Sequence, residues 1–179
     1  QLISKQQELH IYERHNNSID DPVYVEYFNR FLKDAVFPFV NHGKHGFDFG
    51  SGPSPVLSQM LKRDHDYQMD IYDPLYAPDK TYIGKKYNLI TSTEVVEHLS
   101  DPLMTFRLFV KLLKPNGVLA IMTLFHQKDD EAFLKWHYVR DHSHIAFYTA
   151  KTMAYIAKEV GLKMIYTNDC RYTTFVLDR

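Results

Sequence analysis

The chain has 179 residues, of which 45% are hydrophobic and 24% charged, with a formal net charge of −1. This length and composition suit one globular domain with a single substantial core. A net charge near zero provides no excess of positive charge to attract a phosphate backbone, so no nucleic-acid partner is expected. The single cysteine, Cys170, excludes an internal disulfide framework and fits a reducing compartment.

No apolar run approaches the roughly 20 residues of a membrane span, and no signal-peptide pattern opens the chain. We therefore expect a cytoplasmic location and no membrane partner. The first residue is Gln1 rather than Met, which leaves open a segment upstream of the sequence. Nothing in the sequence indicates the oligomeric state.

The first expected element is a helix over residues 23–36. Asp20-Asp21-Pro22 supplies a cap and a proline near the first helical position, and Pro38 ends the helix. Apolar residues recur at helical spacing at Tyr24, Phe28, Phe31, Leu32 and Val36. We expect this helix to bury one apolar face.

Strands then alternate with helices. Strands are expected over residues 46–50, 67–72, 87–92 and 118–124, the last being apolar throughout, as in a central buried strand. Helices are expected to begin at Ser54-Pro55, with Ser54 as the cap, at Asp101-Pro102 and after Thr149. The second of these helices should end at Asn116-Gly117 and the third at Gly161.

Two final strands, residues 163–167 and 173–177, are separated by a short turn and predict an antiparallel hairpin at the sheet edge. The alternation before them predicts an α/β, doubly wound, mostly parallel sheet with helices on both faces. We expect a single domain over residues 1–179. Within it, residues 1–40 would form an N-terminal lid and helix, and residues 41–179 a Rossmann-like core.

A glycine-rich turn follows the first strand at Gly50-Ser51-Gly52. A strand, a Gly-x-Gly and a helix bring bare backbone close to a ligand, although the same pattern occurs in ordinary strand-to-helix turns. Asp73 ends the second strand, 21 residues after Gly52. A carboxylate there can accept both hydroxyls of a ribose, and the alternative is a turn or capping role before Pro74.

These features fit a nicotinamide cofactor as well as S-adenosylmethionine. Dinucleotide sites favour a third glycine, and Ser54 stands at that position. Asp48 would repel a pyrophosphate but could hold the ammonium group of an amino-acid moiety. The pattern therefore favours S-adenosylmethionine as the cofactor.

Four ordered segments now carry a resemblance: FDFGSGPSP (47–55), MDIYDP (69–74), YNLITSTEVVEHLSDP (87–102) and LLKPNGVLAIMT (112–123). They resemble the glycine-rich loop, ribose acid, fourth strand and fifth strand of class I S-adenosylmethionine-dependent methyltransferases. The resemblance implies a seven-stranded-type sheet, whose third strand is short or absent between Asp73 and Tyr87. Ser54 and Asn116 depart from glycines that are usual in the family.

The resemblance also implies roles for individual residues. Backbone at Gly50, Ser51 and Gly52 would pass along the methionine part, with Asp48 near its amino group. Asp73 would hold the ribose, with Pro74 or Tyr72 against the adenine, and Thr93 and Glu94 would line the sulfonium end.

A narrower resemblance is to small bacterial methyltransferases loosely similar to quinone-ring methylases, whose members often carry a zinc ribbon that would lie upstream of Gln1. The residues that carry this resemblance are Tyr12, His15, Asn17, Asp20, Tyr24, Trp136, Tyr138, Asp141, His144 and Tyr148.

Methyl transfer is an in-line displacement that depends on positioning, and a hydroxyl or amine acceptor must also lose a proton. Residues 125–148 follow the central strand and are rich in histidine and aromatic residues. Histidine is the natural base near neutral pH, and we predict His144, then His137, as catalytic residues. The alternative for each is a structural or solvent-facing role.

Glu94, Glu97 and His98 are spaced i, i+3 and i+4, on one face if the segment is helical. Similar residues bind a divalent ion in some O-methyltransferases, but the same string is common in metal-free relatives, and Mg²⁺ prefers oxygen ligands. We predict no metal, and expect Glu97 and His98 to fix the turn before Asp101.

Residues 12–17 are polar and suggest either a lid or a solvated tail.

The sequence as a whole predicts S-adenosylmethionine-dependent methyl transfer to a small-molecule acceptor, by O- or N-methylation. Two alternatives remain open at this point. One is a nucleotide-binding oxidoreductase, and the other is a non-catalytic module that retains the cofactor pocket.

Overall fold

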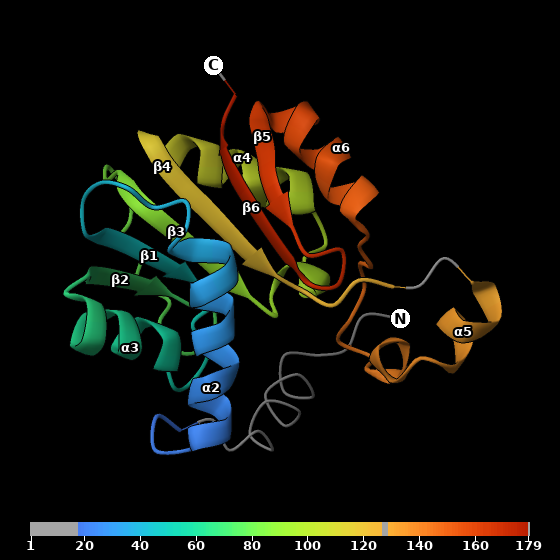
Figure 1. Ribbon diagram of the computed structural model, residues 1–179. Coiled ribbons are helices and arrows are strands. Elements are labelled where there is room, and N and C mark those ends of the chain that lie inside the picture. Colours follow the sequence, from blue (N-terminus) through green and yellow to red (C-terminus); the bar gives the residue numbers. More distant parts are fainter. Residues whose placement is uncertain (1–17, 127–128, 179) are drawn as a thin grey trace.

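The computed structural model describes residues 18–126 and 129–178. This part of the chain contains a six-stranded sheet in the order β2-β1-β3-β4-β6-β5 (Figure 1). The strands are β1 His45–Phe49, β2 Gln68–Tyr72, β3 Tyr87–Thr93, β4 Leu113–Met122, β5 Leu162–Thr167 and β6 Tyr172–Leu177.

The sheet is mostly parallel. β1 pairs in parallel with β2 and β3, and β3 pairs in parallel with β4, whereas β6 is antiparallel to both β4 and β5. The predicted C-terminal hairpin at the edge of the sheet is therefore confirmed. Between Asp73 and Tyr87 the described chain forms no strand and only an isolated bridge, Asp73 to Ala77, which agrees with a short or absent third strand.

Helices cover both faces of the sheet, as predicted (Figure 1). Alternate residues of β4 show the division, because Leu119 and Ile121 belong to one buried cluster and Ala120 and Met122 to the other. The first cluster includes residues of α4 (Pro102–Leu112) and α6 (Ala150–Val160). The second includes residues of α2 (Pro22–Phe31), the π-helical turn η1 (Leu32–Val36) and α3 (Val56–His65).

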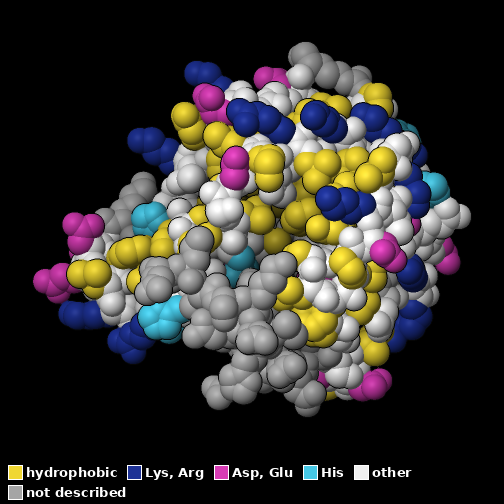
Figure 2. All heavy atoms as spheres, turned by 180° about the vertical axis from the view of Figure 1, so that it is seen from behind, with side chains coloured by type: hydrophobic (Ala, Val, Ile, Leu, Met, Phe, Trp, Pro, Cys, Tyr) yellow, Lys and Arg dark blue, Asp and Glu magenta, His cyan; other side chains and the backbone are white. Residues whose placement is uncertain are grey.

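Short elements complete the described chain: the 3₁₀ turns η2 (Val96–His98) and η3 (His137–Arg140), and the six-residue helix α5 (Asp130–Lys135). α5 projects from the body of the molecule (Figure 1) and buries none of its residues. On the face seen in Figure 2, Lys and Arg side chains are spread over the outer surface, with hydrophobic side chains between them.

Side-chain caps fix three helix starts where the sequence placed them. Asp21 accepts from the N–H groups of Val23 and Tyr24, Asp101 from that of Met104, and Thr149 from that of Thr152. Gly161 ends α6 in the left-handed conformation, with φ of 79°.

Two predicted boundaries were wrong. Ser54 does not cap α3, because the helix begins at Val56 after Pro55 and has no side-chain cap; the Ser54 carbonyl instead accepts from Val56 N–H. The wide turn delays the helix start. Asn116-Gly117 does not end α4 either. The helix ends at Leu112, because Leu113 is already part of β4 and pairs with Tyr87 of β3; the register then shifts before the next pair, Leu89 with Val118. Strand pairing thus takes over residues that turn propensity assigned to a helix end.

The predicted lid, residues 12–17, and three residues of the narrower resemblance, Tyr12, His15 and Asn17, lie outside the described residues. The lid and the division of the chain at residue 40 stay predictions. No helix in the described part of the chain is both long enough and apolar enough to cross a membrane.

Candidate active site

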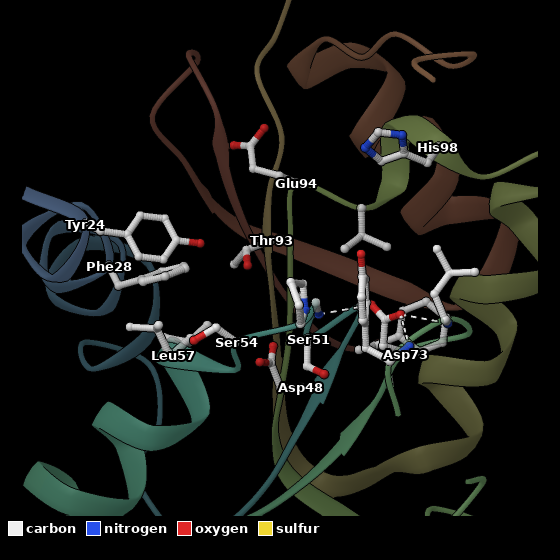
Figure 3. Close-up of a pocket in the computed structure, with 18 of the residues that line it drawn as sticks. Tyr24, Phe28, Asp48, Ser51, Ser54, Leu57, Asp73, Thr93, Glu94 and His98 are labelled. Carbon is white, nitrogen blue, oxygen red and sulfur yellow. Dashed lines mark hydrogen bonds between the residues drawn. The ribbon is translucent and has the colours of Figure 1, made fainter. Parts of the chain in front are cut away.

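A cavity of about 790 Å³ opens beside the carboxyl ends of β1, β2 and β3 (Figure 3). Parallel strands end at the same edge of a sheet, which is why residues from distant parts of the sequence meet there. Every site residue predicted from the sequence lines this cavity: Asp48, Gly50, Ser51, Gly52, Asp73, Pro74, Thr93, Glu94, His137 and His144. Their roles stay predictions.

The glycine-rich turn forms one end of the cavity. Gly50 has φ of 80°, and a Cβ built there would lie 2.2 Å from Val95 Cγ2, so the close approach of these two segments requires glycine. Gly52 has φ of 65°, and a Cβ built there would meet nothing within 4 Å. Gly50 N–H donates to the Tyr72 carbonyl at 2.7 Å, which ties the turn to the end of β2.

Asp73 is buried and holds the turn through backbone donors. Its Oδ2 accepts from Gly52 N–H at 3.0 Å, and its Oδ1 accepts from the N–H groups of Leu75 and Tyr76 at 2.9 and 3.1 Å. The turn role named as the alternative is therefore present. Because Oδ2 receives one such donor, it retains acceptor capacity toward the cavity that it lines.

Asp48 lies at the floor of the same end and is only 3% exposed. It accepts hydrogen bonds from Thr91 Oγ1 at 2.8 Å and Ser58 Oγ at 3.2 Å. Burial raises the pKa of this carboxyl to about 6, against the opposing effect of the two hydroxyls. A cationic group of a ligand would stabilise the ionised form.

Glu94 lies on the opposite side of the cavity from Asp48 and Asp73 (Figure 3), in the left-handed conformation with φ of 53°. Tyr27 OH donates to its Oε1 at 2.7 Å, and Tyr138 OH to its Oε2 at 3.0 Å. Burial, and then the charge of Glu97, raise the pKa of Glu94 to about 7. The carboxyl is thus held between helix α2 and turn η3.

Glu97 is fully buried behind Glu94 and also shares a hydrogen bond with Tyr138 OH. Tyrosine has a single hydroxyl proton, so Tyr138 donates to one of these carboxylates at a time. Glu97 Oε2 has no hydrogen-bond partner among the described residues. Buried polar atoms without a hydrogen-bond partner are uncommon in native structures, and a catalytic role or a bound ligand is one explanation for them.

Glu97 and His98 connect the β3–α4 loop to a segment distant in sequence. The Glu97 carbonyl accepts from the N–H groups of Ile145 and Ala146 at 2.9 and 3.0 Å, and His98 Nδ1 lies 3.0 Å from the Ser143 carbonyl. These two residues therefore stabilise the 143–146 segment. The sequence predicted only that they fix the turn before Asp101, and it did not suggest this long-range contact.

His144 presents a basic nitrogen at the cavity. Its Nδ1 lies 2.8 Å from the Tyr138 carbonyl, and a carbonyl only accepts, so in the neutral ring Nδ1 carries the proton and Nε2 the lone pair. Burial lowers the pKa of His144 below its ordinary value. His137 lines the same cavity but is exposed to solvent.

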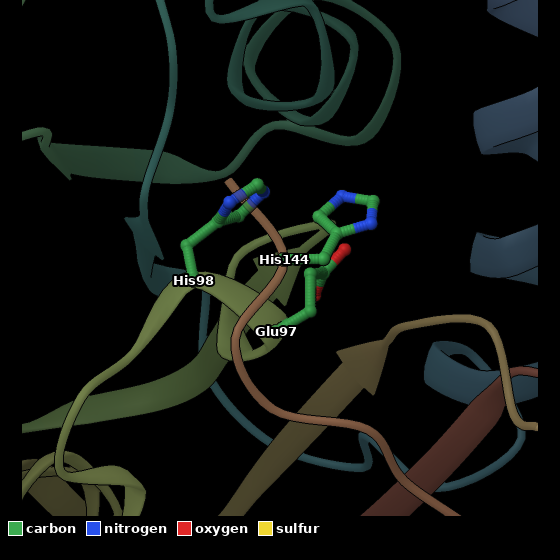
Figure 4. A group of neighbouring side chains, drawn as sticks. All are labelled: Glu97, His98 and His144. Atoms are coloured by element: carbon green, nitrogen blue, oxygen red, sulfur yellow. The ribbon is translucent and has the colours of Figure 1, made fainter. Parts of the chain in front are cut away.

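Glu97, His98 and His144 lie together in Figure 4, with potential ligand atoms all within 4.8 Å of one another. This group differs from the one considered in the sequence, because Glu94 turns toward Tyr27 and His144 takes its place. One carboxylate and two imidazoles suit Zn²⁺ better than Mg²⁺. The prediction that no metal binds stays a prediction.

Sequence reasoning did not single out Tyr27, which is the α2 residue that binds Glu94. It lies outside the main apolar stripe of its helix, and only its pairing with a residue 67 positions later reveals it. Tyr138 was named among the residues of the narrower resemblance, and its contacts with two carboxylates could not be read from the sequence.

Comparison with known proteins places this geometry in a family. A family model described as a methyltransferase domain matches residues 24–167. The chain belongs to this methyltransferase family. The resemblance to class I S-adenosylmethionine-dependent methyltransferases is thereby confirmed at the level of the family, and the predicted cofactor agrees with it.

Two curated relatives are named ubiquinone biosynthesis O-methyltransferase. The one from Histophilus somni is 36% identical over 82 residues, 44% of this chain and 34% of the relative. The one from Dinoroseobacter shibae is 26% identical over 131 residues, 67% of this chain and 51% of the relative. The chain thus spans about a third to a half of the length of these relatives.

Solved structures share the fold at low sequence identity. A chain from Methanococcus maripaludis, assigned as an S-adenosylmethionine-dependent methyltransferase, has a TM-score of 0.65 and 17% identity, covering 98% of this chain and 94% of that one. The O-methyltransferase NcsB1 from neocarzinostatin biosynthesis, solved with S-adenosylmethionine and a naphthoic acid, has a TM-score of 0.62 and 12% identity, covering 98% and 61%.

Proposed function

We propose that this chain binds S-adenosylmethionine at the Gly50–Gly52 turn and transfers its methyl group to the hydroxyl oxygen of a small aromatic acceptor. The observation that carries the proposal is that this turn, Asp73 and the lone-pair nitrogen of His144 border one cavity. Family membership supports methyl transfer, and the O-methyltransferase names of the curated relatives support oxygen as the acceptor atom.

The residues at the turn fit the cofactor. Gly52 faces open space, and Ser51 Oγ is a buried hydroxyl with no hydrogen-bond partner among the described residues. Asp48 would hold the ammonium group and Asp73 the ribose. When bound, S-adenosylmethionine supplies an electrophilic methyl group on its sulfonium.

Tyr24 and Phe28 of α2 form an aromatic wall of the cavity, with ring centroids 4.9 Å apart (Figure 3). His144 Nε2 would accept the proton of the acceptor hydroxyl as the oxygen becomes nucleophilic. Holding the acceptor in line with the methyl group supplies much of the rate in such displacements. The volume of the cavity is typical of small-molecule sites.

Titration calorimetry separates this proposal from a nucleotide-binding oxidoreductase. We expect S-adenosylhomocysteine to bind and NAD⁺ not to bind, and the reverse result would refute the proposal. Asp73→Ala should weaken S-adenosylhomocysteine binding by ~1.5–3 kcal/mol, because charged hydrogen bonds are lost. Unchanged affinity would reject Asp73 as the ribose residue.

Turnover separates an enzyme from a non-catalytic module. With a labelled methyl donor, we expect transfer to at least one hydroxylated aromatic in a panel of catechols, quinols, amines and carboxylates. Transfer to amines alone would move the acceptor atom to nitrogen. Cofactor binding without transfer to any compound would favour the module.

We also propose that residues 1–179 act as a single domain in the cytoplasm, without a nucleic-acid partner. The family match across residues 24–167 supports one continuous unit, and the near-neutral net charge supports the absence of nucleic acid.

A further inference from the structure

The cavity has one sign of charge. Its described lining residues include five carboxylates and no lysine or arginine; the carboxylates are Asp21, Asp48, Asp73, Glu94 and Asp141. Lys and Arg side chains lie instead on the outer surface, as on the face in Figure 2. An acceptor that enters this cavity therefore meets a negative potential on its way in.

The acidic groups are divided between the two ends of the cavity. Asp48 and Asp73 lie at the end assigned to the cofactor, where an ammonium group offsets the charge of Asp48. Glu94 lies at the opposite end (Figure 3), with buried Glu97 behind it. Asp141 Oδ2 lies 3.8 Å from His144 Nε2, beside the proposed base.

One described permanent cation lies near this acceptor end, close enough to interact with the charge of Glu94. Arg171 Nη1 donates to Tyr27 OH at 3.3 Å, and its guanidinium lies 5.6 Å from the Tyr27 ring, but Arg171 does not line the cavity. Burial lowers the pKa of His144, which keeps that ring neutral near pH 7. His98 and His137 contribute imidazoles rather than permanent cations.

We infer that this site selects its acceptor by charge: it takes neutral or cationic aromatics and rejects those with a carboxylate, sulfate or phosphate on the ring. The inference rests on the proposed function. An anion moved from water into an enclosed site next to carboxylates loses hydration and gains repulsion, and no guanidinium or ammonium on the described walls offsets either loss. A protonated amine on the same ring gains attraction instead.

The test uses three probes with the same reacting group. Catechol, dopamine and 3,4-dihydroxybenzoate differ at one ring position, which is unsubstituted, cationic or anionic. With the full chain, S-adenosylmethionine and oxygen-free buffer at pH 8, we expect kcat/KM to be highest for dopamine. For dihydroxybenzoate we expect it to lie at least roughly tenfold below catechol. Equal or better use of dihydroxybenzoate would overturn the inference.

Binding measurements distinguish a failure of charge selection from a failure of the proposed function. If none of the probes is methylated, their dissociation constants are measured on protein loaded with S-adenosylhomocysteine. The order dopamine, catechol, dihydroxybenzoate would support charge selection while the proposed acceptor class fails. Equal affinities, the reverse order or no binding by any probe would overturn charge selection.

One substitution assigns the effect to the cavity. Asp141→Asn removes a charge beside His144 while its retained side-chain oxygen can still accept from Ser143, which binds Asp141 Oδ1 through both N–H and Oγ. We expect the ratio of kcat/KM for dopamine over dihydroxybenzoate to fall several-fold. Glu159→Gln, on the exposed face of α6, makes the same change in net charge outside the cavity and should leave the ratio unchanged. Equal responses would overturn the inference.

Discussion

The two ends of the cavity are built in different ways. The proposed cofactor end comes from the ends of two neighbouring strands, and its contacts involve backbone N–H groups: that of Gly50 donates to the Tyr72 carbonyl, and that of Gly52 donates to the Asp73 carboxylate. The acceptor end comes from side chains of α2, the β3–α4 loop and turn η3, as in the contacts of Tyr27 and Tyr138 with Glu94. The first is a local motif, and the second exists only in the folded chain.

The two ends also differ in how completely their polar groups are satisfied. Asp73 accepts from three backbone N–H groups, which fixes its position. At the acceptor end, the Tyr138 hydroxyl lies within hydrogen-bonding distance of two carboxylates but has one proton to donate. Glu97 Oε2 has no hydrogen-bond partner among the described residues. We interpret the first end as preorganised for one cofactor and the second as able to respond to a bound acceptor.

The largest effect is expected from a substitution that disrupts the glycine-rich turn. Gly50→Ala combines positive φ with a Cβ placed 2.2 Å from Val95, so it should cost roughly 2–5 kcal/mol of folding free energy and abolish measurable cofactor binding. Gly84→Ala is the matched control, because Gly84 has φ of 78° but open space around its Cβ position. Urea unfolding and calorimetry should show a smaller loss of stability and normal binding for Gly84→Ala; equal losses would argue against the role of the Val95 contact.

The next effect is confined to the side-chain end. His144→Ala should lower kcat roughly a hundredfold while the affinity for S-adenosylhomocysteine stays the same. Because the neutral ring is the base and burial lowers its pKa, kcat of the unmodified chain should rise through a pKa below 6.5 and be flat from pH 7 to 8. His137→Ala provides the comparison. Unaltered turnover in His144→Ala would remove this residue as the base.

A smaller effect concerns stability at the cofactor end. The pKa of Asp48 is raised from 3.8 to about 6 in the folded chain, so its ionised form destabilises the fold above pH 6, and this loss disappears as the pH falls toward 4. At pH 7.5 Asp48→Asn should therefore have a free energy of unfolding higher than that of the unmodified chain by up to about 3 kcal/mol, measured as a higher unfolding temperature, and it should show little gain near pH 4. Its cofactor affinity should fall. A variant less stable at pH 7.5 would contradict the sign.

The smallest expected effect is none. If His144 acts as a base and no metal binds, dialysis against EDTA should leave kcat unchanged, and added Mg²⁺ or Zn²⁺ should not raise it. Glu97, His98 and His144 make the measurement informative because their ligand atoms are close together. Activity lost to EDTA and restored by one metal would replace proton abstraction by a metal site at the acceptor end.

Much of the fold was predictable because local chemistry and tertiary structure agree. Asp21, Asp101 and Thr149 cap helices where the sequence placed them, and the apolar run in β4 is buried at the centre of the sheet. The errors at Ser54 and Asn116-Gly117 both arise because local turn propensity is weak. At Asn116-Gly117 the pairing of β4 with β3 outweighs it, and at Ser54 the path of the glycine-rich turn does.

The sequence by itself predicted the glycine-rich end of the cavity, where we propose that the cofactor binds, because a glycine turn and an acid at the end of the next strand act through neighbouring backbone and need only the strand order to meet. Only the tertiary structure decided the acceptor end. Tyr27, Glu94, Glu97, Tyr138 and His144 are brought together by the crossing of α2 and the return of η3 over the sheet. Burial then raises the pKa of the two glutamates and lowers that of His144, and no spacing in the sequence encodes burial.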